Sequence, residues 1–272
     1  MPDILYGTSH KGDETERLVR QALEAGFQGL DSANQRKHYY EAAVGSAVRK
    51  YLSVGVVHRA DLFLQSKFTF PNGHDHRIPY STKATVGEQV RQSFDSSLNL
   101  LGVDRLDSYL LHAPETPGKL SERDFEAWDA IVHLKRAGRV GLVGVSNVNE
   151  VQLQALVNRS SHSLDVVQNR CHWNSKVRRI CQQHQIHYQG FSILRVNLRD
   201  ANSHPIRSIA HRHRVTVAQV LLRFCQCIGI VCLTSTSNVR HMQESLRFGD
   251  CDLSADDIRI IKRITTGRVG DR

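Results

Sequence analysis

The chain has 272 residues, 40% of them hydrophobic, so it can bury one large core, and we expect a single domain over residues 1–272. Its 36 basic and 27 acidic residues are scattered without a Lys/Arg block, so we do not expect nucleic-acid binding. No apolar run is long enough to span a membrane and no signal-peptide pattern begins the chain, so we expect a cytoplasmic protein without membrane contact. Six cysteines without CxxC spacing favour free, buried thiols.

Short apolar runs alternate along the chain with longer amphipathic segments. The expected strands are, in order, 4–6, 29–30, 62–64, 108–111, 142–145, 165–167, 187–191 and 229–233. The expected helices lie between them, at 14–25, 86–101, 125–137, 149–157, 176–183 and 217–226. Gly26, Gly102 and Gly138 follow the first three helices as C-caps, and Thr216 precedes the last as an N-cap.

This alternation predicts an α/β fold, because a strand followed by a helix returns to a parallel neighbour through a right-handed crossover. Eight such units favour a closed (β/α)8 TIM barrel. An open, doubly wound sheet is the alternative, but no G-x-G-x-x-G follows the first strand. Long loops are expected at 71–80 and 195–205, and both follow strands, on the face where loops carry function.

Three side chains with useful chemistry lie at or just past the ends of expected strands. They are Asp31, Lys67 and His112, and Tyr39 is close by in the sequence. Because all strand C-termini of a barrel converge on one mouth, we expect these four side chains to form one site. The plainer interpretation makes Asp31 and Lys67 a structural ion pair and His112 a hydrogen-bonded imidazole at the barrel rim.

An acid, an amine, a phenol and an imidazole suit the reduction of a carbonyl group. A hydride that reaches the carbonyl carbon leaves negative charge on the oxygen, so a proton donor must lie within hydrogen-bonding distance. A phenol is a weak acid at neutral pH, and we expect the Lys67 ammonium to lower the pKa of Tyr39, with Asp31 holding Lys67 in place. We expect His112 to bind and orient the substrate oxygen.

Several motifs also resemble those of a known family. GFQGLDSA, LFLQSKF, LDSYLLHAP, GLVGVSN and VVQNR, followed by FSIL and TSTSNVRHMQESL, resemble the aldo-keto reductases over residues 6–264. The resemblance implies a barrel that reduces aldehydes or ketones with a nicotinamide cofactor and without a metal. It assigns the family's catalytic roles to Asp31, Lys67 and His112. The N-terminal hairpin that often closes the barrel bottom in this family is expected to be absent or reduced.

The position of the catalytic tyrosine leaves three alternatives. ANQRKHYYEAAVG holds two residues more after Asp31 than the family pattern does. Aligning Glu41 with the family glutamate places His38 in the tyrosine position, whereas a turn shifted by one residue places Tyr39 there. Tyr39 is the first choice, Tyr40 the second and His38 the third.

The resemblance also implies which residues bind the nucleotide. Ser146, Asn147 and Gln168 match the polar residues that bind the nicotinamide carboxamide. Phe191 matches the aromatic residue that stacks on the nicotinamide ring. Ser192 and Leu194 of the same FSIL run are expected to contact the cofactor as well.

The segment after the last strand departs from the family pattern. In many NADP-binding members a Lys, and an Arg six residues later, reach the 2′-phosphate of adenosine. Matching Glu244 to the family glutamate places Ser235 at the Lys position and His241 at the Arg position. The residues expected to bind this end of the cofactor are Thr236, Ser237, Arg240, His241 and Glu244. NADPH is the expected cofactor, and NADH is the alternative.

The substrate is expected to be a small carbonyl compound bound in an open site with loose selectivity. Its expected lining residues are Tyr6, His38, Phe68, Tyr80 and Trp173. No HExxH and no zinc-like Cys/His spacing occurs, so we expect no metal, and we expect a monomer or a weak homo-oligomer. The alternative function is a regulatory or redox-sensing subunit that binds the nucleotide on the same barrel with little turnover.

Overall fold

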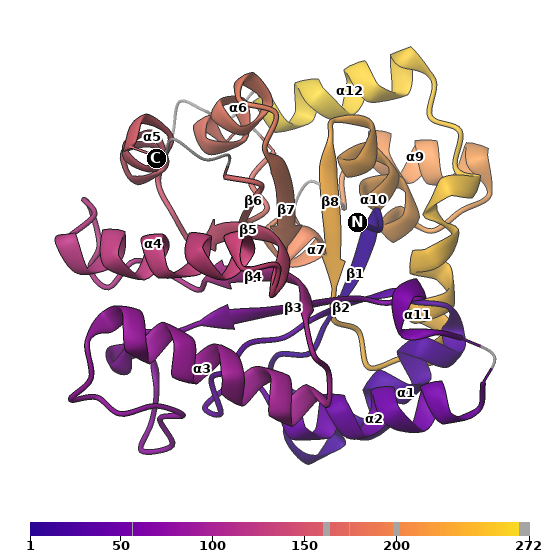
Figure 1. Ribbon diagram of the computed structural model, residues 1–272. Helices are drawn as coiled ribbons and strands as arrows, with labels where there is room; N and C mark the ends of the chain where they lie inside the picture. Colours follow the sequence, from indigo (N-terminus) through magenta and orange to yellow (C-terminus); the bar gives the residue numbers. More distant parts are fainter. Residues whose placement is uncertain (56, 160–163, 174, 198–201, 267–272) are drawn as a thin grey trace.

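A computed structural model describes residues 1–272 except 56, 160–163, 174, 198–201 and 267–272. Within the described residues, eight parallel strands pair in sequence order, and β8 pairs with β1 to close a barrel. Helices surround the strands on the outside (Figure 1). The predicted (β/α)8 TIM barrel is confirmed, and the open, doubly wound sheet is wrong.

Every predicted strand is present, most of them slightly longer than expected. The strands are β1 Ile4–Gly7, β2 Gly29–Asp31, β3 Phe63–Phe68, β4 Leu106–Leu111, β5 Val140–Ser146, β6 Val166–Arg170, β7 His187–Phe191 and β8 Ile230–Thr234. The extension of β3 matters for function, because it places Lys67 inside a strand rather than beyond its end.

The helices follow the strands in regular alternation. They are α1 Thr15–Ala25, α2 Glu41–Ser53, α3 Val86–Leu101, α4 Glu122–Arg136, α5 Glu150–Arg159, α6 Lys176–Gln183, α7 Ile193–Val196, α9 His204–His213, α10 Val217–Cys227, α11 Val239–Leu246 and α12 Ala255–Thr266. In the described part of the chain, the connections also hold four short 3-10 helices, η1 Gly12–Glu14, η2 Arg59–Asp61, η3 Pro71–Gly73 and η4 Arg247–Asp250. All six predicted helices are present. The predicted loop 195–205 overlaps α7 and α9, and its residues 198–201 lie outside the described part of the chain.

Helix α2 has no counterpart among the predicted segments, and Gly45 explains why. This glycine interrupts the apolar pattern of EAAVGSAVRKYLS, which weakens the helical signal. In the fold, a Cβ at Gly45 would lie 2.1 Å from the backbone oxygen of Leu100 at the end of α3. Close packing of α2 on α3 therefore requires glycine at a position where helix propensity disfavours it.

Side chains of β3 alternate between the barrel interior and the helix-covered exterior. Leu64 and Phe68 pack in the main apolar core, whereas Phe63 packs with Leu5 and Leu233 in a separate small cluster. The period of two residues in a strand then directs Lys67 inward. An ammonium group in the barrel interior must find hydrogen-bonding partners there.

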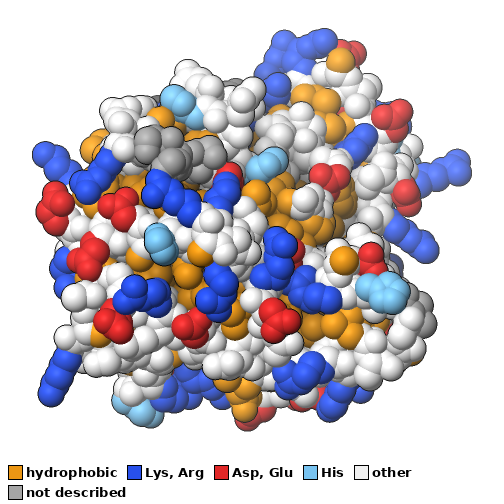
Figure 2. Space-filling model, viewed as in Figure 1, with side chains coloured by type: hydrophobic (Ala, Val, Ile, Leu, Met, Phe, Trp, Pro, Cys, Tyr) orange, Lys and Arg blue, Asp and Glu red, His pale blue; other side chains and the backbone are white. Residues whose placement is uncertain are grey.

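The described residues also bear on four features considered in the sequence: membrane spans, cysteines, clusters of charge and metal sites. No helix among the described residues is long and apolar enough to cross a membrane. The prediction of free thiols is confirmed, and all six cysteines except Cys227 are buried. Figure 2 shows Lys and Arg side chains interspersed with Asp and Glu on the visible face. Among the described residues, no group of three or more His, Cys, Asp or Glu is arranged to hold a metal.

Candidate active site

The centre of the site is a buried ion pair inside the barrel. The Lys67 side chain is fully buried, and its Nζ donates hydrogen bonds to Asp31 Oδ1 at 2.7 Å and to the backbone oxygen of Ser32 at 2.7 Å. These partners compensate for the loss of water around the ammonium group. The predicted pairing of Asp31 with Lys67 is therefore present in the structure.

Two glutamines donate to Asp31, and a third, Gln189, connects them. Gln65 Nε2 and Gln168 Nε2 donate to Asp31 Oδ1 at 2.7 and 2.9 Å, and each also donates to Gln189 Oε1 at 2.8 Å. The network joins β2, β3, β6 and β7 across the barrel interior. Sequence reasoning missed Gln65 and Gln189, although a glutamine within the apolar strand runs FLQSKF and HYQGF was a usable signal.

The structure places Tyr39 beside the ion pair. Lys67 Nζ lies 5.3 Å from the centre of the Tyr39 ring, and the His112 ring meets the Tyr39 ring edge-on with centres 5.7 Å apart. Asp31, Tyr39 and His112 line one cavity. The four residues expected to form one site do lie together.

The two rival side chains are placed differently. Tyr40 is the N-cap residue of α2. The Arg36 guanidinium carbon lies over the Tyr40 ring, 3.7 Å from the ring centre. His38 lies at the cavity wall, where its ring stacks on that of His10 with centres 4.5 Å apart. Among the ring interactions of the described residues, Lys67 and His112 both contact the ring of Tyr39. Neither of them contacts the ring of Tyr40 or of His38 there.

The electrostatic expectation for Tyr39 is wrong. Burial raises the pKa of the Tyr39 phenol well above its usual value, and the negative charge of Asp31 raises it further, whereas a hydrogen bond with Ser9 lowers it. The net shift is therefore opposite to the expected one, and the Lys67 ammonium is paired with Asp31 at 2.7 Å. The phenol therefore stays protonated at neutral pH.

His112 is held as a neutral imidazole. Burial, followed by the positive charge of Lys67, lowers the pKa of His112 well below its usual value. Its Nδ1 is 2.7 Å from the Thr69 hydroxyl, and its backbone N–H donates to the oxygen of Phe68 at 2.8 Å. Thr69 carried no signal in the sequence, because its role depends on a contact between the segments that follow β3 and β4.

A buried carboxyl group lies on the outer side of β3. Glu41, the first residue of α2, accepts hydrogen bonds from the hydroxyls of Ser66 and Ser97. Burial raises the pKa of Glu41 to about 7, although these hydrogen bonds and the charge of Lys67 lower it. Sequence reasoning used Glu41 only as an alignment position.

The raised pKa of Glu41 predicts a pH dependence of stability. Between the usual value of 4.5 and about 7, the folded protein keeps a proton that the unfolded chain has lost. The free energy of unfolding should therefore fall as pH rises through this window, by roughly 3 kcal/mol in total. Urea unfolding from pH 4.5 to 8 should show this fall in the wild type and not in Glu41→Gln. Parallel profiles for the two proteins would contradict the assignment.

Three of the four catalytic candidates, Asp31, Tyr39 and His112, line a cavity of about 790 Å³ at the strand C-termini, whereas Lys67 is fully buried. Six of the predicted cofactor residues line it, namely Asn147, Gln168, Phe191, Ser192, Leu194 and Thr236. Ser146 is buried behind this wall, where its hydroxyl donates to the backbone oxygen of Gln168 at 2.7 Å. The nicotinamide-end residues predicted from sequence are therefore gathered in one place.

Several predicted substrate residues do not line this cavity. His38 does, but Tyr6, Phe68, Tyr80 and Trp173 are absent from its wall. Phe68 points away from the barrel interior and packs between the rings of Phe70 and Tyr80. Phe68 was expected in the site because it follows Lys67 in the sequence. Side chains alternate along a strand, however, so the Phe68 side chain points outward.

Tyr6 and Trp173 are likewise core residues. The Tyr6 hydroxyl donates to the backbone oxygen of Thr236 at 2.9 Å while its ring packs on Phe27. Trp173 packs edge-on against Phe224 with ring centres 5.3 Å apart. Their placement in the core differs from the predicted contact with substrate.

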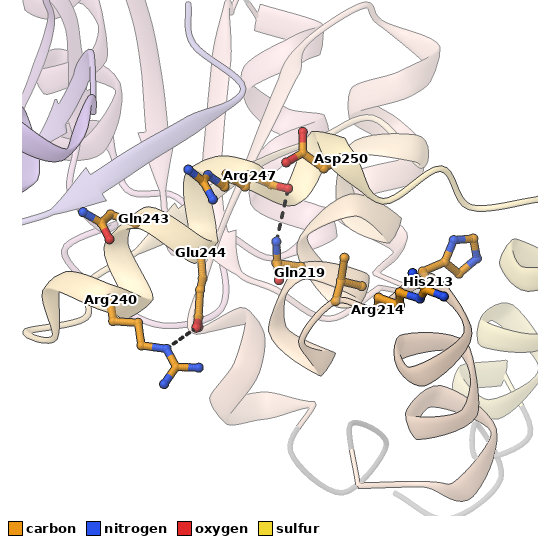
Figure 3. A pocket seen from close by; sticks show the side chains of 9 residues that line it. His213, Arg214, Gln219, Arg240, Gln243, Glu244, Arg247 and Asp250 are labelled. Atoms are coloured by element: carbon orange, nitrogen blue, oxygen red, sulfur yellow. Dashed lines mark hydrogen bonds and ion pairs between the residues drawn. The ribbon is translucent and has the colours of Figure 1, made fainter.

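The segment after β8 also differs from expectation. Arg240 and Glu244 line a second, smaller hollow of about 510 Å³ beside α10 and η4, and Arg240 Nε donates to Glu244 Oε1 at 2.7 Å (Figure 3). Ser237 and His241 are exposed and line neither of these two cavities. Four of the five residues predicted to bind the phosphate end therefore lie outside the main cavity wall.

A lysine that the sequence reasoning missed lies near this segment. Lys11, in the connection after β1, lines the main cavity, and its Nζ donates to the backbone oxygen of Ser235. Ser235 is the residue that the resemblance matched to the lysine of many NADP-binding members. The Lys11 ammonium group therefore lies next to Ser235, although Lys11 follows β1 and Ser235 follows β8.

Comparisons with known proteins show the family of this chain. The model of the aldo/keto reductase family matches residues 3–266. Dihydrodiol dehydrogenase 3 of Bos taurus is 31% identical over 278 residues, covering 91% of this chain and 82% of the relative. The uncharacterized oxidoreductase YtbE of Bacillus subtilis is 29% identical over 267 residues, covering 96% and 87%. The crystal structure of an aldo/keto reductase from Brucella melitensis, 28% identical, matches with a TM-score of 0.82 over 97% of this chain and 95% of that chain. The chain belongs to the aldo/keto reductase family.

Proposed function

We propose that this protein reduces aldehydes or ketones to alcohols with a nicotinamide nucleotide, and that Tyr39 donates the proton. The observation that carries the proposal is the position of Tyr39 and His112 at one wall of the 790 Å³ cavity, with Lys67 buried beside the Tyr39 ring. Membership of a family of carbonyl oxidoreductases supports it.

Tyr39 is suited to donate a proton although its pKa is raised. The bound nucleotide supplies the hydride, which turns the carbonyl oxygen into an alkoxide. An alkoxide is a stronger base than a phenolate, so a neutral Tyr39 still gives up its proton to it. Lys67, with Nζ 5.3 Å from the ring centre, then stabilises the phenolate as it forms. Asp31 holds Lys67 in that position.

His112 is suited to orient the carbonyl oxygen. A neutral imidazole carries one N–H, and the hydrogen bond at Nδ1 decides which nitrogen bears it. If the Thr69 hydroxyl donates to Nδ1 across the 2.7 Å contact, Nε2 keeps the proton. The Nε2–H is then the group that binds the substrate oxygen, and Thr69 is the residue that fixes the tautomer.

The cavity wall has the chemistry of a dinucleotide site, and we propose NADPH as the cofactor. Phe191 offers an aromatic ring, Asn147 and Gln168 offer amides, and Thr236 offers a hydroxyl. Arg195 and Lys11 add positive charge to the same wall, as phosphate groups require. The altered segment after β8 leaves NADH as the second candidate.

Lys11 offers a direct test of the phosphate end. Replacing it with methionine removes the ammonium group beside Ser235 while keeping most of the apolar stem. We expect Lys11→Met to weaken NADPH binding by about tenfold, the usual effect of losing one charged hydrogen bond. Fluorescence titration of the nucleotide measures this Kd without turnover. An unchanged Kd would show that Lys11 does not bind the nucleotide. The control is Lys37→Met, at an exposed position.

Steady-state turnover tests the proposed function itself. Oxidation of NADPH or NADH with 4-nitrobenzaldehyde, followed by loss of nicotinamide absorbance, should show saturable activity. Tight nucleotide binding without turnover of any aldehyde or ketone would instead favour the regulatory alternative. Comparing the two nucleotides in the same assay decides which cofactor the protein prefers.

A further inference from the structure

The short 3-10 helix after β3, η3, joins the segments that carry the proposed acid and the orienting histidine. The backbone oxygen of Gly73, the last residue of η3, accepts a hydrogen bond from Gln35 Nε2 at 2.8 Å. The backbone oxygen of Gln35 in turn accepts the N–H of Tyr39 at 2.9 Å. η3 also contacts the connection after β4, because Asn72 Nδ2 donates to the backbone oxygen of Glu115 at 2.8 Å. The helix therefore links the turn before α2 to the connection after β4.

The side chain of Thr69 is held between Gly73 and His112. A Cβ atom at Gly73 would lie only 2.6 Å from Thr69 Cγ2, so the Thr69 methyl packs where a side chain at residue 73 would begin. The Thr69 hydroxyl, on the same Cβ as that methyl, lies 2.7 Å from His112 Nδ1. A rotation about the Cα–Cβ bond to another staggered position would move both groups together. The room that glycine leaves for the methyl therefore decides where the hydroxyl lies.

The backbone on either side of this contact is fixed by hydrogen bonds. The backbone oxygen of Thr69 accepts from the Tyr80 hydroxyl at 2.6 Å and from His74 Nε2 at 3.1 Å, and both of these side chains are buried. The backbone oxygen of His112 accepts from Asn147 Nδ2 at 2.9 Å. Crowding of the Thr69 methyl is therefore relieved by rotation of its side chain and not by movement of the chain.

We propose that Gly73 is a positioning residue, which keeps the Thr69 hydroxyl on His112 Nδ1 and thereby keeps the imidazole proton on Nε2. This inference rests on the proposed carbonyl reduction. A carbonyl oxygen only accepts hydrogen bonds, so Nε2 must carry the proton when the substrate binds. Nδ1 is then an acceptor, and among the described residues the Thr69 hydroxyl is the hydrogen-bond partner of the His112 ring. Without that donor the proton can move to Nδ1, and the ring then offers no N–H to the substrate.

Gly73→Ala is the first test, because it displaces the Thr69 hydroxyl without removing it. The added Cβ should turn the Thr69 side chain, while the contacts of Tyr80 and His74 with its backbone remain. We expect kcat for 4-nitrobenzaldehyde to fall by about tenfold or more, since complete loss of a donor to the developing oxyanion costs about 10² to 10³. The Kd for the nucleotide and the midpoint of urea unfolding should stay close to those of the wild type.

Two double variants show whether Gly73 acts through Thr69. Thr69→Ser keeps the hydroxyl and lacks the methyl, so Gly73→Ala with Thr69→Ser should regain most of the kcat lost in Gly73→Ala. Thr69→Val lacks the hydroxyl, so adding Gly73→Ala to it should lower kcat no further. The full loss of Gly73→Ala in both double variants would overturn the inference. The control is Gly87→Ala, where the nearest atoms to an added Cβ are 3.8 Å away, and its kcat should be that of the wild type.

NMR of the His112 ring nitrogens measures the tautomer without turnover. The signals are identified by their loss in His112→Gln. In the wild type, Nε2 should be protonated and Nδ1 unprotonated, and in Gly73→Ala and Thr69→Val the proton should shift toward Nδ1. A protonated Nδ1 in the wild type, or the same tautomer in all variants, would overturn the inference. If the tautomer shifts as expected but the wild type reduces no carbonyl compound, the positioning of His112 stands and the proposed function is contradicted.

Discussion

Tyr39→Phe lowers kcat for aldehyde reduction by a factor on the order of 10² to 10⁴, the usual contribution of a positioned proton donor. The substitution removes only the hydroxyl group, so the ring should keep its edge-on contact with His112 and its place beside Lys67. Nucleotide affinity should therefore remain that of the wild type. Steady-state turnover with 4-nitrobenzaldehyde and a fluorescence titration of NADPH measure the two effects separately.

Tyr40→Phe is the matched control for this prediction. The Tyr40 ring packs under Arg36, and neither this contact nor its N-cap position depends on the hydroxyl. Its kcat should stay within a factor of about two of the wild type, since no transition-state interaction is lost. Near-normal turnover in Tyr39→Phe together with a large loss in Tyr40→Phe would transfer the role of acid to Tyr40.

Lys67→Met destabilises the fold by about 3 to 5 kcal/mol, because it leaves the buried Asp31 carboxylate without its counter-charge. The Lys67 side chain is fully buried and that of Asp31 is 4% exposed, so water cannot replace the lost ammonium group. Gln65 and Gln168 still donate to Asp31, but neutral donors compensate only part of a buried charge. Urea unfolding at pH 7 measures the change.

Two further variants test whether the loss of stability in Lys67→Met comes from the unpaired buried charge or from the loss of any lysine. Lys176 pairs with Glu150 at 3.0 Å at the surface, with the lysine side chain 67% exposed, so Lys176→Met should cost no more than about 1 kcal/mol. The double variant Asp31→Asn with Lys67→Met should regain much of the stability lost in Lys67→Met alone, because it removes the buried charge. If the double variant were as unstable as Lys67→Met, packing rather than charge would explain the loss.

The barrel could be predicted from sequence because its signals are local and repeated. Each strand is a short apolar run, and helices such as α1 and α3 carry apolar residues at helical spacing and end at glycine. Helix α2 was missed because Gly45 serves packing against Leu100, a contact between residues far apart in sequence. Helix α11 was missed because it is short and largely polar.

The site was predictable where a residue's position on a strand decides its place, and not where a loop conformation does. Asp31, Lys67 and His112 follow from strand order, but choosing Tyr39 over Tyr40 required the fold of the turn that Gln35 supports. Phe68 was assigned to the substrate site because that assignment did not consider that side chains of β3 alternate between the inside and the outside of the barrel. Lys11 reaches Ser235 from a connection more than two hundred residues away, which no local pattern records.

Transfer of deuterium from doubly labelled nicotinamide C4 to the product tests the central claim most directly. In a single turnover of the wild type with dideuterated NADPH and 4-nitrobenzaldehyde, mass spectrometry should find one deuterium in each alcohol molecule, on the carbinol carbon. The same experiment with Tyr39→Phe should give the same label at a much lower rate. Alcohol without deuterium, or nucleotide that stays bound and unreacted, would contradict the account.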